Sequence, residues 1–310
     1  MAGIIGINSI GSWLKKEFGE KVIKLAIDGG FTCPNRDGTL GYGGCAFCSS
    51  EGSGELASSI CGNGENNDDA IARAIEEQIR MRREKWPNAK KFIAYFQSHT
   101  NTYAPVGKLR PMFEAAISQS GIVGLAIATR PDCLPDDVLD LLSELNEKTF
   151  LWVELGLQTI HEDTFGRRCT LEDYDRAVAE LHARGIRTVT HLILGLPGES
   201  RGQMEESVRY VCREPHIFGI KLHLLNIVKG SGMEKTHCGY EPFDSIEDYV
   251  SFVCDLLEII PADITIHRLT GDVPRKLLIS PEWSYKKRTI LNGIAHELRM
   301  RGTYQGCALE

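Results

Sequence analysis

Short apolar runs alternate with amphipathic segments along most of the chain, and this alternation predicts a regular series of strands and helices. Six runs have the length and composition of buried strands: residues 22–27, 92–96, 124–129, 150–157, 187–194 and 217–224. The segments between them repeat apolar residues every three or four positions, as helices with one buried face do. Strands that alternate with helices form a parallel sheet with right-handed crossovers. Six such units predict an α/β protein, either an open doubly wound sheet or a partial barrel.

Two further segments flank these units, and no change in composition separates them from the rest. The first 20 residues predict a short amphipathic lead-in helix, and residues 21–262 hold the six units. Residues 263–310 contain one more strand candidate, at 264–269, and a final helix near 284–301. We therefore expect this last part to be an extension packed on the core rather than a separate domain.

Composition and charge exclude several classes of protein. The 310 residues are 42% hydrophobic and 25% charged, which is typical of a globular protein with one large core. The sequence has no run of about 18 apolar residues and no basic-then-apolar leader, so we expect a cytoplasmic protein without a membrane partner. The formal net charge of −7 disfavours an extended groove for DNA.

Two local clusters of basic residues contrast with this acidic balance. They are Arg80, Arg82, Arg83, Lys85, Lys90 and Lys91, and then Lys286, Lys287, Arg288, Arg299 and Arg301. A solvated helix face is the simpler interpretation of each cluster. The second lies beside Trp283 and Tyr285, and cations next to aromatic side chains suit a flexible RNA loop. If RNA is the substrate, we expect Lys286, Lys287 and Arg288 to contact it.

Three of the ten cysteines follow the first predicted strand at close spacing. Cys33, Cys45 and Cys48 form a C-x11-C-x2-C pattern in a glycine-rich loop, with no fourth cysteine nearby. Three thiolates can hold three irons of a [4Fe–4S] cube and leave the fourth iron open for reaction. Phe47, directly before the last cysteine, can shield such a cluster or stack on a purine.

A structural zinc site with a distant fourth ligand is the alternative for these three cysteines. Disulfides are not expected in a reducing compartment. The cysteines follow the carboxyl end of a strand, where α/β enzymes place their chemistry, and this position favours the cluster. The other cysteines show no C-x2-C or C-x3-C spacing, so no second cluster is predicted.

The cysteine loop CPNRDGTLGYGGCAFC resembles that of the YhcC/YtqA-type radical S-adenosylmethionine (SAM) proteins, relatives of the Elp3 and oxygen-independent coproporphyrinogen oxidase groups. The likeness continues through AYFQSHTNTYAP, ATRPDCLP, WVELGLQTIHEDTF, HLILGLPGES and KLHLLNIVKGSGM, over roughly residues 20–235, and more faintly into IHRLTGDVP and SPEWSYKK. The resemblance implies a partial (β/α)6 barrel of the TIM type with a C-terminal α/β extension. It also implies a [4Fe–4S] cluster and SAM as cofactors, and so favours the cluster over zinc.

The resemblance places SAM contacts at the other strand ends. The candidates are Ser98, His99, Thr100, Asn101, Glu154, Gln158, His191 and Gly195. All but Gln158 have a simpler alternative: a polar turn for residues 98–101, a buried ion pair for Glu154, a core histidine for His191 and a tight turn at Gly195. Related proteins also carry an arginine that grips SAM, and here Arg167 and Arg168 are both candidates.

The activity implied by the resemblance is reductive cleavage of SAM at the cluster, which gives a 5′-deoxyadenosyl radical for hydrogen abstraction. A one-electron reductant of the flavodoxin or ferredoxin type is then expected as partner. Relatives of the YtqA type suggest tRNA as substrate, at the wobble uridine, on the path from a carboxymethylaminomethyl to an aminomethyl side chain. A small metabolite or a protein is the alternative substrate, and a non-catalytic, zinc-stabilised binding module is the alternative class.

Overall fold

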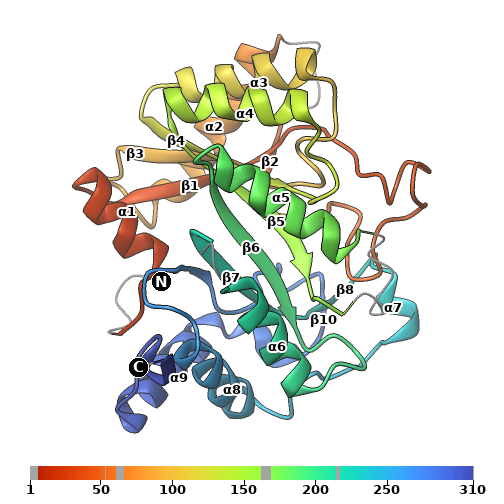
Figure 1. The fold of residues 1–310 in the computed structure, drawn as a ribbon, viewed down its shortest axis with the longest axis vertical. Coiled ribbons are helices and arrows are strands. Elements are labelled where there is room, and N and C mark those ends of the chain that lie inside the picture. Colours follow the sequence, from red (N-terminus) through yellow and green to blue (C-terminus); the bar gives the residue numbers. More distant parts are fainter. Residues whose placement is uncertain (1–5, 53, 61–65, 162–168, 214–216, 310) are drawn as a thin grey trace.

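The computed structural model describes residues 6–52, 54–60, 66–161, 169–213 and 217–309, and its centre is one curved parallel sheet. In spatial order the strands are β2 (Ser58–Ser59), β1 (Val22–Asp28), β3 (Lys91–Phe96), β4 (Ile122–Thr129), β5 (Phe150–Gln158), β6 (Arg187–Leu194), β7 (Gly219–Leu224) and β9 (Thr265–Arg268). Every neighbouring pair is parallel. Because the two edge strands, β2 and β9, do not pair with each other in the described part of the chain, the fold is a partial barrel of the TIM type, and this prediction is confirmed (Figure 1).

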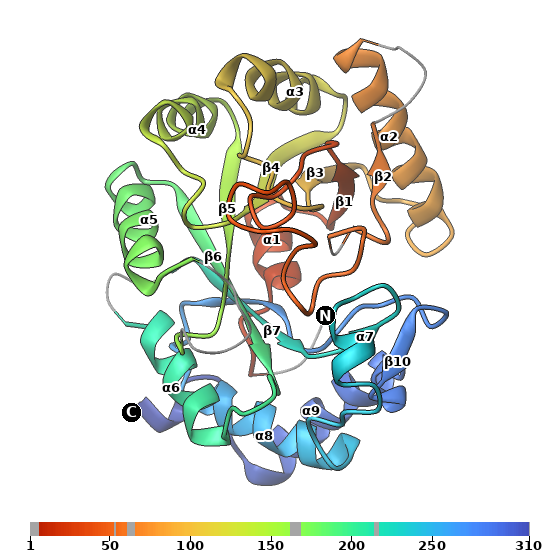
Figure 2. The ribbon, with the colours of Figure 1, turned by 90° about the vertical axis from the view of Figure 1, so that its right-hand side faces the viewer.

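Helices follow the strands and surround the sheet from outside, as Figure 2 shows. They are α2 (Asn67–Arg83), α3 (Val106–Ser118), α4 (Asp136–Lys148), α5 (Leu171–Ala183), α6 (Arg201–Val211) and α8 (Ile246–Glu258). The start of α5 shows how local sequence sets a boundary. Thr170 Oγ1 accepts a hydrogen bond from the Asp173 N–H at 3.1 Å, and the Asp173 carboxylate accepts one from the Thr170 N–H at 3.0 Å. This reciprocal pair satisfies two amides that the first helical turn leaves without partners.

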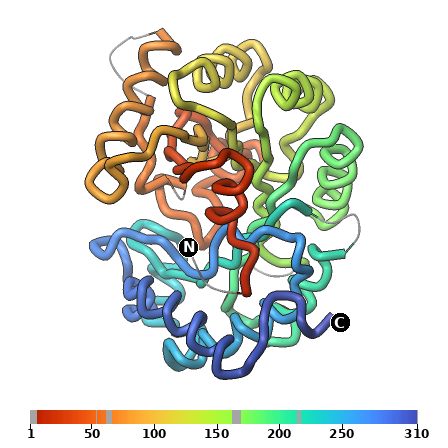
Figure 3. The backbone as a smooth tube through the Cα atoms, turned by 90° about the vertical axis from the view of Figure 1, so that its left-hand side faces the viewer, coloured from red at the N-terminus to blue at the C-terminus, as the bar shows by residue number. Residues whose placement is uncertain are grey.

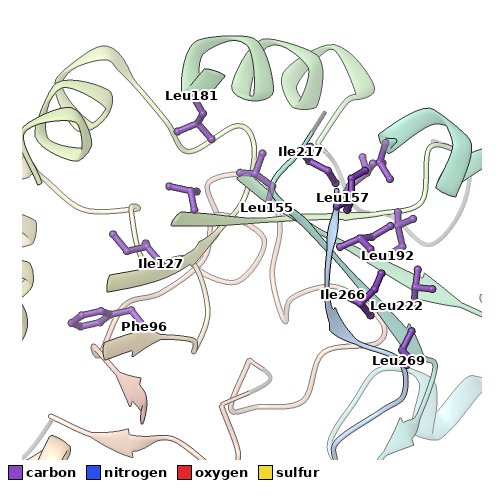
Figure 4. Packing of buried hydrophobic residues seen from close by; sticks show 14 of the residues in the cluster. Phe96, Ile127, Leu155, Leu157, Leu181, Leu192, Ile217, Leu222, Ile266 and Leu269 are labelled. Carbon is purple, nitrogen blue, oxygen red and sulfur yellow. The ribbon is translucent and has the colours of Figure 1, made fainter. Parts of the chain in front are cut away.

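The larger core lies between the outer face of the sheet and these helices. Alternate strand residues point outward because side chains alternate along a strand, and they meet apolar helix residues such as Leu181 of α5 (Figure 4). Leu155, Leu192 and Leu222 on neighbouring strands are 0 to 1% exposed. Burial of each such side chain contributes about 1.5–3 kcal/mol, so this layer supplies much of the stability of the fold.

The inner face of the sheet is apolar at one end. There α1 (Ile10–Phe18) lies across the amino-terminal ends of the strands (Figure 3). The Trp13 ring stacks on Phe150 at 5.3 Å and meets Phe218 edge-on at 5.0 Å. Along β5, Trp152 continues this apolar layer, and Glu154 is the next inward residue. We call the aromatic side chains at this end, Trp13, Phe150, Trp152 and Phe218, the aromatic plug. Along β5, the barrel interior therefore changes from this plug to charged side chains within two residues.

The C-terminal part of the chain completes the sheet. β9 pairs with β7, and α9 (Lys287–Arg301) packs on α8. The short elements here are β8 (Ile227–Val228), which pairs antiparallel with β10 (Leu278–Ser280), α7 (Met233–Thr236) and two 3₁₀ turns, Glu282–Tyr285 and Cys307–Leu309. No helix in the described ranges combines the length and apolar character that a membrane crossing requires. The three-part division of the chain stays a prediction.

Candidate active site

A cavity of about 230 Å³ opens at the carboxyl ends of the strands. The loop after β1 contributes three cysteines to its wall, and every strand from β3 to β9 in the main sheet contributes at least one side chain at or near its end. The ionisable residues of the wall are Cys33, Arg36, Cys45, Cys48, Glu55, Tyr95, His99, Arg130, Glu154, His191, Lys221, His223, Arg268 and Asp272. Parallel strands bring their carboxyl ends together at one edge, so residues far apart in sequence meet here.

The cysteine loop, residues 33–48, is built from tight turns. The Arg36 N–H donates to the Cys33 carbonyl at 2.8 Å, and the Cys48 N–H donates to the Cys45 carbonyl at 3.0 Å. Gly43 and Gly44 have φ of +82° and +91°, a conformation that residues with a Cβ rarely adopt. These turns bring all three cysteines to the same cavity wall.

The thiols of the loop are close neighbours. Asn35 Nδ2 donates to Cys45 Sγ at 3.1 Å. The pKa of Cys48 is raised well above its usual value by its hydrogen bond with Cys45, by burial and by the charges of Cys45 and Cys33. A group of three sulfur donors facing one cavity has the chemistry of an iron–sulfur cluster ligand set.

Among the described residues, no three His, Cys, Asp or Glu side chains converge on a point that a single metal ion could occupy. A lone zinc would need its thiolates about 3.8 Å apart, since it binds each at about 2.3 Å in a tetrahedron. A cube binds each thiolate through a different iron, so its three ligands need not converge. The donor set of the cysteine loop is therefore compatible with a [4Fe–4S] cluster.

The segment after β3 supports the cysteine loop. A Cβ added to Gly52 would come within 2.3 Å of His99 Nδ1, and one added to Gly54 would come within 1.9 Å of Ser98 Oγ. His99 itself has φ of +58°, which is unusual for a residue with a side chain. The structure thus packs Ser98 and His99 directly against the chain that follows the cysteines.

The four candidates after β3 divide into two groups. His99 and Thr100 line the cavity, whereas Ser98 and Asn101 lie behind its wall. Asn101 is fully buried, and its Nδ2 donates to the Ala128 carbonyl at 2.8 Å and the Phe96 carbonyl at 3.2 Å. Its side chain therefore ties the ends of β3 and β4 together.

Glu154 lies at the centre of a buried polar cluster that we call the floor network, formed by Lys24, Tyr95, Glu154, His191 and Lys221. Glu154 Oε2 accepts hydrogen bonds from Lys221 Nζ and, at 2.9 Å, from His191 Nε2. Its Oε1 accepts one from the Trp152 indole N–H at 2.9 Å and lies 3.7 Å from Lys24 Nζ. Lys221 Nζ also donates to the Tyr95 hydroxyl at 3.0 Å. Both carboxylate oxygens are thus occupied by side chains of the protein.

Electrostatics set the protonation states of Glu154 and His191 in the floor network. Burial alone would raise the pKa of Glu154, but Lys221, Lys24 and His191 outweigh burial and hold it well below its usual value. Burial and the charge of Lys221 lower the pKa of His191 to about 4, against the opposing effect of Glu154. At neutral pH the carboxylate is therefore ionised and the imidazole neutral.

Five further residues were predicted to contact SAM: Phe47, Gln158, Gly195, Arg167 and Arg168. Phe47 and Gln158 line the cavity, and Gln158 has φ of +71°. Gly195 lies behind the wall, where a Cβ would come within 2.3 Å of Pro242. Arg167 and Arg168 lie outside the described residues, so their roles stay predictions.

Several cavity residues were not predicted from the sequence. Arg130, directly after β4, forms a two-pronged ion pair with Asp132, with Nε–Oδ1 at 2.9 Å and Nη2–Oδ2 at 2.7 Å. Tyr95 and Arg268 reach the cavity from β3 and β9. One sequence signal could have identified Arg130. It continues the inward-facing alternation of β4 and lies directly before Pro131, where the strand stops.

Together, a partial α/β barrel and a cysteine-lined cavity at its strand ends define a radical SAM enzyme. The chain belongs to the radical SAM superfamily, because the model of that superfamily matches residues 33–211, and the radical SAM C-terminal domain matches residues 217–300. Its cofactors are the [4Fe–4S] cluster and SAM.

Within the superfamily, the chain is of the YhcC/YtqA type. It is 50% identical to YtqA of Bacillus subtilis over 297 residues, which cover 94% of this chain and 89% of that protein. It is 38% identical to YhcC of Escherichia coli K12 over 308 residues, covering 98% and 95% of the two chains. Among solved structures, Elp3 of the archaeon Methanocaldococcus infernus has the same fold, with a TM-score of 0.64 and 17% identity over 92% of this chain and 64% of that one.

Proposed function

We propose that Cys33, Cys45 and Cys48 hold the [4Fe–4S] cluster of this enzyme. The observation that carries this proposal is the position of all three cysteines on one cavity wall at the carboxyl ends of the strands. Asn35 donates a hydrogen bond to Cys45, and such donors tune the potential of a cluster. With SAM bound, the cluster supplies reductive cleavage of SAM to methionine and a 5′-deoxyadenosyl radical that abstracts hydrogen.

SAM would occupy the cavity between the cysteine loop and the floor network. The candidates that line this space are Phe47, His99, Thr100, Gln158 and His191. Because four side chains already surround the Glu154 carboxylate, we assign Glu154 as a positioning residue that holds Lys221 and His191 in place. The aromatic plug beneath the floor network excludes water from the closed end of the barrel.

The proposed substrate is the wobble uridine of tRNA, with its carboxymethylaminomethyl side chain converted to aminomethyl. Similarity to the tRNA uridine(34) acetyltransferase of Methanocaldococcus jannaschii supports this choice, at 24% identity over 164 residues, 51% of this chain and 30% of that one. Position 34 of tRNA is the wobble position. Radical SAM chemistry also needs an electron donor, which we propose to be a flavodoxin or ferredoxin.

The experiment is anaerobic incubation of reconstituted enzyme, SAM and dithionite with tRNA from a strain that lacks the gene, followed by nucleoside mass spectrometry. We expect the wobble nucleoside to lose mass corresponding to replacement of its carboxymethyl group by hydrogen. The Cys45→Ala variant serves as control and should leave the nucleoside unchanged. If no nucleoside changes while SAM cleavage is detected in the same tube, the substrate is a small molecule or a protein instead.

A further inference from the structure

The sheet of the partial barrel does not close, and charged side chains gather where its two ends face each other. We call this boundary the seam; β1 and α2 border one side, and β9 and α9 border the other. Gln78 of α2 is fully buried, and its Oε1 accepts a hydrogen bond from the Ala26 N–H of β1 at 3.3 Å. One turn further along α2, Arg82 Nη2 donates to the same Gln78 oxygen at 3.3 Å. Arg82 therefore lies on the side of α2 that faces the seam.

Cations from both sides meet around one carboxylate, that of Asp272, which follows β9. Lys287 Nζ lies 2.8 Å from Asp272 Oδ2, and Arg268 Nη2 lies 3.5 Å from the same oxygen. Burial would raise the pKa of this carboxyl, but Arg268, Lys287 and Arg82 outweigh burial and hold the pKa below its usual value. Lys85, exposed just beyond α2, acts electrostatically on Lys287. Arg82 and Lys85 of the first basic cluster of the sequence thus lie near Lys287 of the second.

The seam carries more positive charge than its acidic partner can neutralise. Asp272 is the carboxylate that Arg82, Arg268 and Lys287 share, and Lys85 acts electrostatically on Lys287, so cations outnumber this carboxylate in the described part of the chain. Arg82 Nε is buried and has no hydrogen-bond partner among the described atoms. A local excess of cations in a chain of net charge −7 attracts anions.

We propose that the seam binds a phosphodiester group of the RNA substrate, with Arg82, Arg268 and Lys287 around the phosphate and Lys85 at the outer rim. This inference rests on the proposed function and adds the surface by which the substrate is held. Arginine presents a fork of donors that matches phosphate oxygens, and lysine adds a point charge.

Continuity between the seam and the cavity favours a polymer over a small anion. Arg268 and Asp272 belong to the cavity wall, whereas Lys85 is exposed outside it. A phosphate at the seam therefore leaves the neighbouring nucleotide beside the entrance to the cavity. Tyr285 lies nearby, 39% exposed, with the Arg275 guanidinium 4.4 Å from its ring centre, and an unstacked base can stack on such a ring.

The test uses the reconstituted holoenzyme and a fluorescent tRNA anticodon stem–loop, with binding measured by anisotropy over a range of salt concentrations. Lys85→Glu and Lys287→Glu should each weaken binding about tenfold at low salt and lower the salt slope by about one. Lys85 is exposed, so its variant remains informative even if Lys287→Glu disturbs the fold. Arg299→Glu, in the last turn of α9, is the matched control and should bind within about twofold of the unmodified protein.

The outcomes of this test distinguish RNA binding at the seam from the proposed reaction on the wobble uridine. Iron content and melting temperature establish that the variants retain fold and cluster. Unchanged RNA affinity in both Lys85→Glu and Lys287→Glu would contradict RNA binding at the seam. An equal loss of affinity in Arg299→Glu, or an absence of RNA binding by the unmodified protein, would contradict it as well. If RNA binding depends on the seam but no nucleoside changes, the RNA-binding site is supported and only the proposed wobble-uridine reaction is contradicted.

Discussion

The cysteine loop and the floor network face the same cavity but are built in opposite ways. The loop lies outside regular secondary structure, and its three thiols are only partly buried. The floor network comes from five strands, and Glu154 and Lys221 are 0% and 1% exposed. In the floor network the opposite charges pair with each other, whereas the thiols of the loop crowd one another and raise the pKa of Cys48.

This difference shows which part of the site depends on its cofactor. The floor network is complete without a ligand, because its carboxylate, ammonium and imidazole groups satisfy one another. The cysteine loop gathers donors that stabilise each other poorly until a metal cluster binds them as thiolates. We therefore expect changes in the loop to affect the cluster, and changes in the floor network to affect the stability of the protein itself.

The largest effect is expected in the cysteine loop. Cys45→Ala removes one of three proposed cluster ligands, so bound iron should fall to background and SAM cleavage should be lost. Iron analysis and detection of 5′-deoxyadenosine check both. Cys254→Ala, on α8 with its thiol near the Ile294 carbonyl, is the control and should keep its iron. Equal iron loss in both variants would contradict the assignment.

In the floor network, Glu154→Gln should reduce stability while sparing the cluster. The variant leaves Lys221 buried without its counter-ion, which costs about 3–5 kcal/mol. Urea unfolding of the cluster-free protein measures the loss, and a SAM titration followed by EPR should show weaker SAM binding. The double variant with Lys221→Met should recover part of the stability. A double variant no more stable than Glu154→Gln would show that the two side chains are not coupled.

Asn35→Ala tests the hydrogen bond to Cys45 and should have a smaller effect. Loss of a donor to a cluster ligand disfavours the electron-rich reduced form, so the reduction potential should fall and SAM cleavage should slow by about tenfold. Iron content should stay the same. Redox titration by EPR is the measurement, with Asn146→Ala on α4 as the matched control. A potential equal to that of the unmodified protein would remove Asn35 from this role.

The effect that is smallest at neutral pH concerns His191, and it appears as the pH falls. Its pKa is about 4 in the folded protein, compared with about 6.5 in the unfolded chain. Between these values the unfolded chain binds the extra proton, so the free energy of unfolding falls as pH falls, by up to about 1.4 kcal/mol per pH unit. His191→Asn should flatten this slope by about one proton, measured by urea unfolding from pH 7.5 to 4.5. An unchanged slope would show that other groups, such as His223 and His267, carry it.

The sequence predicted the fold best where a strand is long enough to show an apolar pattern within its own residues. β1 and β3 to β7 extend over six to nine residues, long enough for their apolar character to stand out. β2, β8 and β10 have two or three residues each, too few to show any period. α2 shows the limit at a boundary: Asn66 caps this helix, and its Oδ1 accepts a hydrogen bond from the Asp69 N–H at 3.0 Å.

In the active site, features formed by residues close in sequence could be predicted, whereas contacts between distant residues could not. The three cysteines are close in sequence, so their spacing predicts a shared metal site, and their position after a strand favours a cluster over zinc. The partners of Glu154 are distant, with Lys221 67 residues away, and only the curvature of the sheet brings them together. Asn101 was expected near SAM, but the register of β3 against β4 puts two backbone carbonyls beside its amide.

The Gln78 side chain has a consequence for how copies of this protein treat one another. A sheet that stops short of closure presents backbone amides and carbonyls to which a strand of another molecule can add, the first step of aggregation. Gln78 accepts from the Ala26 N–H and donates to the Leu56 carbonyl at 3.0 Å, so it stands in for part of a missing strand. At the other end, the Asn8 carbonyl accepts from the Ile266 N–H at 2.8 Å and covers β9. One buried amide and one short backbone segment therefore help an unfinished barrel to resist self-association.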